Sequence, residues 1–185
     1  MYSRSSTLIV GMADMDSSRF QIYCHGRWLG VQVLQSPNDL LYIQNVLTEV
    51  RPDVVIETGT YKVTATLDGG LTVYIASVLE ALKGQESEDW DPMVITIDRN
   101  EPSQVFDREW FCPVCQECTK AWQTPLWHRR VHFIQGYSDQ VDVLMEVEDM
   151  IRSKQGTVQS SGRNITVLIT LDASHEAEGV LTELL

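Results

Sequence analysis

The sequence predicts an α/β protein built around a parallel β-sheet. Four short runs are rich in Val and Ile and nearly continuous in apolar character, which is typical of strands buried on both faces of such a sheet. The runs are DVVIE at 53–57, MVITID at 93–98, VHFIQG at 131–136 and ITVLITLD at 165–172. Segments with helical spacing separate them, so we expect right-handed βαβ units. With a switch point beside the first strand, the expected spatial order of these four strands is 3-2-1-4.

Two helices are predicted to flank the first strand. Ser36 and Pro37 form an N-cap and first-turn pair. The apolar residues that follow share one helical face; they are Leu40, Ile43, Leu47 and Val50. The crossover helix after the first strand is expected over 70–82, with Gly84 in the position of a C-terminal cap. Its apolar face consists of Leu71, Tyr74, Ile75, Val78, Leu79 and Leu82.

The second half of the chain is predicted to contain a third helix capped by Ser138 and ended between Lys154 and Gly156. Its expected apolar face is Val141, Leu144, Met145 and Ile151. A last helical start covers 176–185, whereas 99–130 and 156–164 are expected to be irregular. Four strands alone would leave the outer edge of the fourth strand open. The last helix, further chain or a homo-oligomeric partner would have to cover it.

Composition and charge exclude several function classes. A chain of 185 residues with 43% hydrophobic content is long enough for one domain and short for two. No apolar run approaches the roughly 20 residues of a membrane span, and none near the start resembles a secretory signal, so we expect a soluble, cytoplasmic protein. The formal charge of −12 argues against a nucleic-acid partner. The basic cluster of His128, Arg129, Arg130 and His132 is interpreted as a solvated loop.

The junction VIETGT at 55–60 is the strongest local indication of a ligand site. Glu57 ends the first strand, and Gly59 lets the backbone turn sharply at the carboxyl edge of the sheet, where open α/β sheets bind ligands. The glycine array that admits a pyrophosphate to a helix N-terminus is missing. The loop therefore favours a cofactor without a pyrophosphate.

Acidic residues end two further strands. Asp98 can accept hydrogen bonds from the vicinal hydroxyls of a ribose, or be a solvated strand end; its register with Glu57 favours the ribose. Asp172 and His175, in LDASH at 171–175, suit a divalent metal or proton transfer. The alternative is a helix-capping aspartate with an exposed histidine.

Three cysteines, Cys112, Cys115 and Cys118, lie within a Trp-rich stretch at about 101–130. Without an export signal, their thiols are expected to be reduced or metal-bound rather than paired. The C-x-x-C spacing is that of a zinc knuckle, with His128 or His132 as the fourth ligand. The motif is incomplete, however, and an insertion that packs on the sheet without metal is the favoured interpretation.

The order of these motifs resembles the cephalosporin hydroxylase and rhamnosyl O-methyltransferase family. The motifs are WLG at 28–30, SPNDL at 36–40, RPD at 51–53, IETGT at 56–60, GG at 69–70, ID at 97–98, GYS at 136–138 and LDASH at 171–175. The resemblance implies a Rossmann-like sheet of the class I methyltransferase type over 28–185, after an N-terminal segment at 1–27. It also implies binding of S-adenosylmethionine (SAM), and magnesium in some members.

The resemblance assigns roles to individual residues. Glu57, Thr58 and Gly59 form the methionine side of the cofactor site, and Asp98 holds the ribose. Residues 136–138, including Ser138, line the adenine side. Asp172 is a metal ligand, and His175 faces the reaction centre as the catalytic base.

The implied function is methyl transfer from SAM to a hydroxyl of a sugar, glycolipid or other small molecule, which includes lipid biosynthesis. Compared with the family, residues 61–68 form an insertion, and the sheet is incomplete at the C-terminus, where an acidic pair would finish the metal site. This 185-residue chain is therefore expected to bind the cofactor and to show little methyl transfer. The alternatives are an inactive cofactor-binding or interaction module and a nicotinamide-dependent oxidoreductase; the latter lacks its glycine fingerprint.

Overall fold

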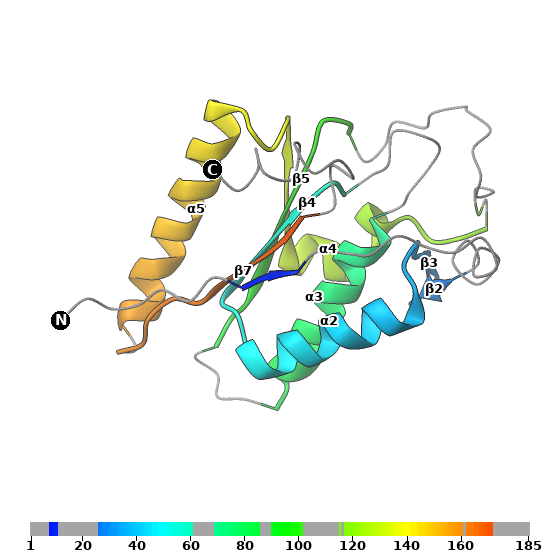
Figure 1. The fold of residues 1–185 in the computed structure, drawn as a ribbon, viewed down its shortest axis with the longest axis horizontal. Helices are drawn as coiled ribbons and strands as arrows, with labels where there is room; N and C mark the ends of the chain where they lie inside the picture. Colours follow the sequence, from blue (N-terminus) through cyan, green and yellow to red (C-terminus); the bar gives the residue numbers. More distant parts are fainter. Residues whose placement is uncertain are drawn as a thin grey trace.

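The fold is described from a computed structural model, in which residues 8–10, 26–60, 69–85, 90–101, 115, 117–160 and 162–171 are described. A β-sheet lies at its centre (Figure 1). The sheet has five strands in the order β1-β7-β4-β5-β6. The four long strands are β4 (Val54–Thr58), β5 (Met93–Asp98), β6 (Val131–Gln135) and β7 (Val167–Leu171). All of their pairings are parallel. The predicted order 3-2-1-4 is therefore confirmed.

The outer edge of β7 is covered by an element that the sequence did not predict. Strand β1 (Leu8–Val10) pairs with β7 in parallel, with Leu8 opposite Leu168 and Val10 opposite Thr170. The sequence left the cover of this edge to the last helix, further chain or a homo-oligomeric partner, whereas β1 pairs with it in the structure. Three residues are too few to show strand periodicity in the sequence.

Helices cover both faces of the sheet (Figure 1). On one face, α2 (Pro37–Val50), α3 (Gly70–Lys83) and α4 (Pro125–Arg130) enclose an apolar core that includes Val55 of β4 and Val94 of β5. On the other face, α5 (Val141–Ser160) packs on Ile56 and Ile95. No helix in the described part of the chain is long and apolar enough to cross a membrane.

The two helices that flank β4 are confirmed. The Ser36 side chain accepts a hydrogen bond from Asp39 N at the start of α2, and Gly84 ends α3. Nearly all of α3 is buried, because it lies between the sheet and α2. The Tyr74 hydroxyl of α3 donates to Leu40 O at 2.7 Å, and burial raises the pKa of Tyr74.

Helix α5 differs from its prediction in both its length and its buried face. It continues to Ser160, through the segment expected to be a loop. Val143 and Val147 are buried, while Val141, Leu144 and Met145 are 73%, 51% and 61% exposed. Two apolar stripes run along this helix, and the one at Val143, Val147 and partly buried Ile151 contacts the sheet.

The segment before β6 was expected to be irregular and instead contains the turn η2 (Ala121–Gln123) and helix α4. Thr124 caps α4, with its hydroxyl accepting from Trp127 N at 3.2 Å. Arg130, expected in a solvated loop, is 6% exposed and pairs with Glu80 and Asp91 at 2.5 Å each. Burial alone would lower the pKa of Arg130, but the hydrogen bonds to these carboxylates raise it.

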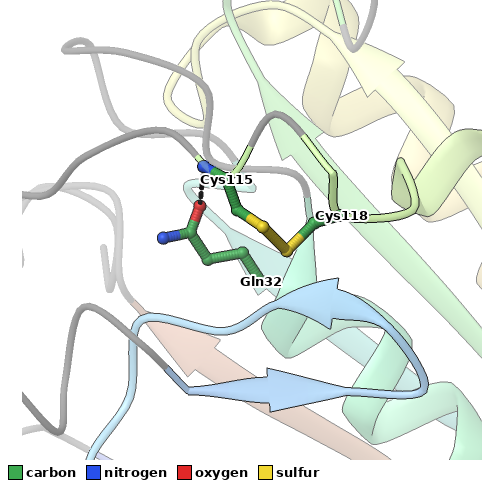
Figure 2. Close-up of a disulfide and its surroundings, with 3 residues drawn as sticks. All are labelled: Gln32, Cys115 and Cys118. Atoms are coloured by element: carbon green, nitrogen blue, oxygen red, sulfur yellow. Dashed lines mark hydrogen bonds between the residues drawn. A yellow bond between two sulfur atoms is a disulfide. The ribbon is translucent and has the colours of Figure 1, made fainter.

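A small hairpin of β2 (Arg27–Trp28) and β3 (Val31–Gln32) packs on α3. The Trp28 ring meets Tyr74 edge-on at 4.9 Å between centroids, and Trp28 Nε1 donates to Ser77 Oγ at 2.7 Å. The side chain of Gln32 accepts from Cys115 N at 3.1 Å (Figure 2).

Cys115 and Cys118 form a disulfide next to this hairpin (Figure 2). The expectation of reduced or metal-bound thiols was therefore wrong for these two residues. Their Cα atoms are 5.2 Å apart, well inside the range that a disulfide can bridge. Cys112 lies outside the described residues.

Candidate functional site

The carboxyl ends of β4 and β5 lie side by side. Thr58 is opposite Ile97 in the register, and Gly59 N donates to Ile97 O at 2.9 Å. The chain after β4 thus stays attached to β5 for one residue before it turns away. This places the ends of the two predicted motifs, IETGT and ID, on neighbouring strand tips.

Glu57 points to the sheet face that α3 covers, because it accepts a hydrogen bond from Thr72 of α3. On this face it shares a row with Thr96 of β5 and Thr170 of β7. Its side chain is 1% exposed. Oε2 of the carboxyl group accepts hydrogen bonds from Thr96 Oγ1 at 2.6 Å and from Thr72 Oγ1 of α3. Thr58 is 4% exposed. Glu57 is therefore a buried, hydrogen-bonded carboxylate near the carboxyl edge of the sheet rather than a surface carboxylate.

Two glycines with positive φ bracket the predicted insertion at 61–68, which itself lies outside the described residues. Gly59 has φ 84° and Gly69 has φ 66°, and Gly69 is the N-cap of α3. A side chain is strained in this left-handed region, so both positions favour glycine. The first turn of α3, where the helix dipole is positive, lies beside Glu57, because Thr72 in this turn donates to the Glu57 carboxylate.

Asp98 ends β5 and is 6% exposed. Its Oδ1 accepts hydrogen bonds from Asn100 N at 2.8 Å and Asn100 Nδ2 at 3.1 Å. This side-chain-to-backbone turn fixes the carboxylate at the strand tip. The carbonyl of Asp98 accepts from Gly136 N at 3.0 Å, so the loops after β5 and β6 leave the sheet together.

Ser138 is half-buried in the turn between β6 and α5. Gly136 precedes it with φ 158°, and a Cβ atom there would lie 2.4 Å from Val143 Cγ2. The guanidinium of Arg99 lies 5.9 Å from the centroid of the Tyr137 ring, and Tyr137 is 53% exposed. Arg99 was not singled out in the sequence, and Tyr137 was included only as part of the range 136–138; their positions directly after Asp98 and Gly136 were the available indication.

The predicted metal ligand Asp172 and the predicted base His175 lie outside the described residues. Leu171, which ends β7, is opposite Thr58 in the register. Within the described ranges, no group of three or more His, Cys, Asp and Glu side chains is arranged to hold a metal ion.

A comparison with known protein families identifies the family of this chain. Residues 21–185 match the family described as rhamnosyl O-methyltransferase/CmcI. The chain belongs to this family. It is accordingly a member of a methyltransferase family, as its motifs predicted. No curated protein is similar enough to count as a relative.

Solved structures of CmcI share the fold of this rhamnosyl O-methyltransferase/CmcI family member. CmcI with Mg-SAM is 15% identical, with a TM-score of 0.51, over 94% of this chain and 61% of that one. Apo CmcI is 16% identical, with a TM-score of 0.51, over 95% of this chain and 61% of that one. A structure of CmcI with SAH is 17% identical, with a TM-score of 0.49, over 97% of this chain and 73% of that one. The chain thus spans less than two thirds of the length of two of these three relatives.

Proposed function

We propose that this protein transfers a methyl group from SAM to a hydroxyl of a sugar, glycolipid or other small molecule. The observation that carries the proposal is the presence of two buried carboxyl side chains, Glu57 and Asp98, near the ends of the neighbouring strands β4 and β5 in a chain of this family. The structure of CmcI with Mg-SAM supports the choice of cofactor.

The described residues fit SAM at three points. Asp98 is held rigidly at the tip of β5 and can accept hydrogen bonds from the ribose hydroxyls. Glu57, Thr58 and Gly59 would lie at the methionine end, where Gly59 allows a close approach of backbone to ligand. Ser138 and the exposed ring of Tyr137 would lie on the adenine side.

SAM supplies an electrophilic methyl group on a sulfonium centre, and transfer leaves the neutral thioether SAH. The acceptor oxygen forms the new bond to carbon while the carbon–sulfur bond breaks, and the hydroxyl proton must go to a base. We propose His175 as that base and Asp172 as a ligand for magnesium, which lowers the pKa of a bound hydroxyl. The protein otherwise contributes alignment of the two reactants.

Calorimetric titration of the chain with SAM and with SAH, each with and without magnesium, tests the cofactor assignment. Transfer of a labelled methyl group from SAM to a panel of glycosides tests the acceptor class. Glu49→Ala, an exposed position on α2, serves as a matched acidic control for Asp98→Ala. Absence of SAM and SAH binding by the folded chain would contradict the proposal.

A further inference from the structure

The α3 face of the sheet changes from apolar to polar within one row of side chains. Leu168, Val55 and Val94 form a continuous apolar row on β7, β4 and β5. The next row toward the carboxyl edge consists of Thr170, Glu57 and Thr96. Glu57 is 1% exposed and Thr96 is 0% exposed. Burying a carboxylate costs free energy unless hydrogen bonds compensate for the lost water, so this row requires its own polar partners.

Two threonine hydroxyls supply such partners to one oxygen of Glu57. Thr96 Oγ1 donates to Glu57 Oε2 at 2.6 Å from the neighbouring strand, and Thr72 Oγ1 donates to the same oxygen from the first turn of α3. Thr72 is 0% exposed. A single carboxylate oxygen thereby connects β4, β5 and α3.

The hydrogen bonds have a defined direction when Glu57 is ionised. A hydroxyl group can donate only one hydrogen bond, and Thr96 donates it to Glu57. In the hydrogen bond between Thr60 and Thr96, Thr60 must therefore be the donor. The result is a chain from Thr60 to Thr96 to Glu57, with Thr72 as a second donor at the end. Bonds linked in this way strengthen one another in a low-dielectric interior.

This chain of hydrogen bonds joins both ends of the segment at 61–68. Thr60 immediately precedes that segment, and Thr72 lies in the helix that follows it. We propose that Thr96 and Thr72 are positioning residues: they fix the Glu57 carboxylate and hold the end of β4 and the first turn of α3 in the geometry that binds SAM. The inference rests on the proposed function, because it concerns the methionine side of the same site. It predicts that the hydroxyl groups, beyond the volume of the side chains, set the affinity for SAM.

Thr170 provides a matched control inside the same row. It lies opposite Glu57 on the other neighbouring strand and is 6% exposed. Its hydroxyl donates to Ile56 O at 3.4 Å, a backbone group of β4. Thr170→Val therefore removes a buried hydroxyl at the same depth and leaves the Thr96 and Thr72 hydroxyls in place.

The experiment measures the dissociation constant for SAM and the thermal midpoint of the full chain and its variants. Thr96→Val and Thr72→Val are expected to weaken SAM binding about tenfold or more, the usual scale for losing a hydrogen bond to a charged group. Thr96→Ser, which restores the hydroxyl without the methyl group, and Thr170→Val are expected to bind within about threefold of wild type.

Each outcome decides the inference. If wild type binds SAM and the Val variants at positions 96 and 72 bind equally well, the positioning role is wrong and the proposed function stands. Equal losses in Thr96→Val, Thr96→Ser and Thr170→Val would also overturn it, because they would indicate a general packing effect. If wild type binds neither SAM nor SAH, the proposed function itself fails. Should Thr96→Val not fold, Thr72→Val and Thr96→Ser give the same decision.

Discussion

The turn from Asp98 to Asn100 holds the Asp98 side chain in place, so this side chain would need little reorganisation to accept hydrogen bonds from a ribose. Both Asn100 donors reach Oδ1 of this carboxylate, at 2.8 and 3.1 Å. Asp98→Ala is expected to weaken SAM binding by about 1.5–3 kcal/mol, the cost of losing charge-assisted hydrogen bonds. Calorimetric titration measures this loss, with Glu49→Ala as the control. Unchanged affinity in an Asp98→Ala variant with intact circular dichroism would remove Asp98 from the site.

Gly70 is required by close contact between two elements. An added Cβ atom would lie 2.0 Å from Gln32 O and 2.8 Å from Val33 Cα, both in the backbone of the segment at β3. Gly70→Ala is therefore expected to destabilise the fold by about 1–3 kcal/mol, since neither obstacle can rotate away.

Gly156 is the matched control for this substitution. It lies within α5, and an added Cβ atom meets nothing within 4 Å. Gly156→Ala is expected to stabilise the protein by about 0.5–1 kcal/mol through helix propensity. Urea unfolding of both variants measures the two effects, and destabilisation of similar size in each would show that the contact with Gln32 is unimportant.

At the scale of single residues, the sequence could identify the acidic strand ends better than the residues that hold them in place. Glu57 and Asp98 stand out because an acid ends each apolar run. Thr72 and Thr96 carry no such signal, because a threonine within a strand or helix is ordinary. Their role depends on the register of β4 with β5 and on the approach of α3.

The buried face was predicted well for helices with one apolar stripe, but not for the helix with two apolar stripes. Helix α2 has a start signal and a single buried face at Ile43, Val46 and Leu47. Helix α5 offers two stripes, and only contact with the sheet selects between them. The exposed stripe at Val141, Leu144 and Met145 cannot be distinguished from a core face by spacing alone.

The Cys115–Cys118 disulfide is an element-level feature whose effect should be local. Besides the Gln32 contact, Thr119 N donates to Gly30 O at 2.9 Å. A disulfide that closes so short a loop removes little entropy from the unfolded chain. Reduction by a dithiol is expected to leave the thermal midpoint nearly unchanged while the amides of Cys115 and Thr119 exchange faster with solvent.

Hydrogen exchange of the oxidised and reduced chain measures this difference. A Cys115→Ser, Cys118→Ser double variant should reproduce the reduced pattern under oxidising conditions. Strong protection of both amides in the double variant would show that the hairpin contacts hold without the disulfide.

Over the whole molecule, the order of the central strands could be predicted because buried parallel strands are continuous apolar runs and right-handed crossovers leave few arrangements. The addition of β1 could not, because the parallel pairing of three residues with β7 is decided by an edge far away in the sequence. The same limit applies to Asp91 and Arg130. These two residues are distant in the sequence, and no motif indicates that they form an ion pair.

Asp91 joins helices on both faces of the sheet. Its carboxylate pairs with Lys83 of α3 at 2.5 Å, with Arg130 at the end of α4 at 2.5 Å and with Lys154 of α5 at 3.6 Å. Burial would raise the pKa of Asp91, but the hydrogen bonds from Lys83 and Arg130 and the charge of Lys154 outweigh it. The pKa of Asp91 therefore lies well below its ordinary value.

A lowered pKa in the folded state means that Asp91 stabilises the fold above the unfolded pKa of about 3.9 and loses this contribution as the pH falls toward its folded pKa. Asp91→Asn is accordingly expected to lower the urea midpoint at pH 7 and to match wild type more closely near pH 2. Because the side chain is 57% exposed, solvent screening keeps the effect modest. Glu148→Gln, in the exposed pair with Arg152, is the control and should change the midpoint little at either pH. An equal deficit of Asp91→Asn at both pH values would show that its charge does not hold the helices together.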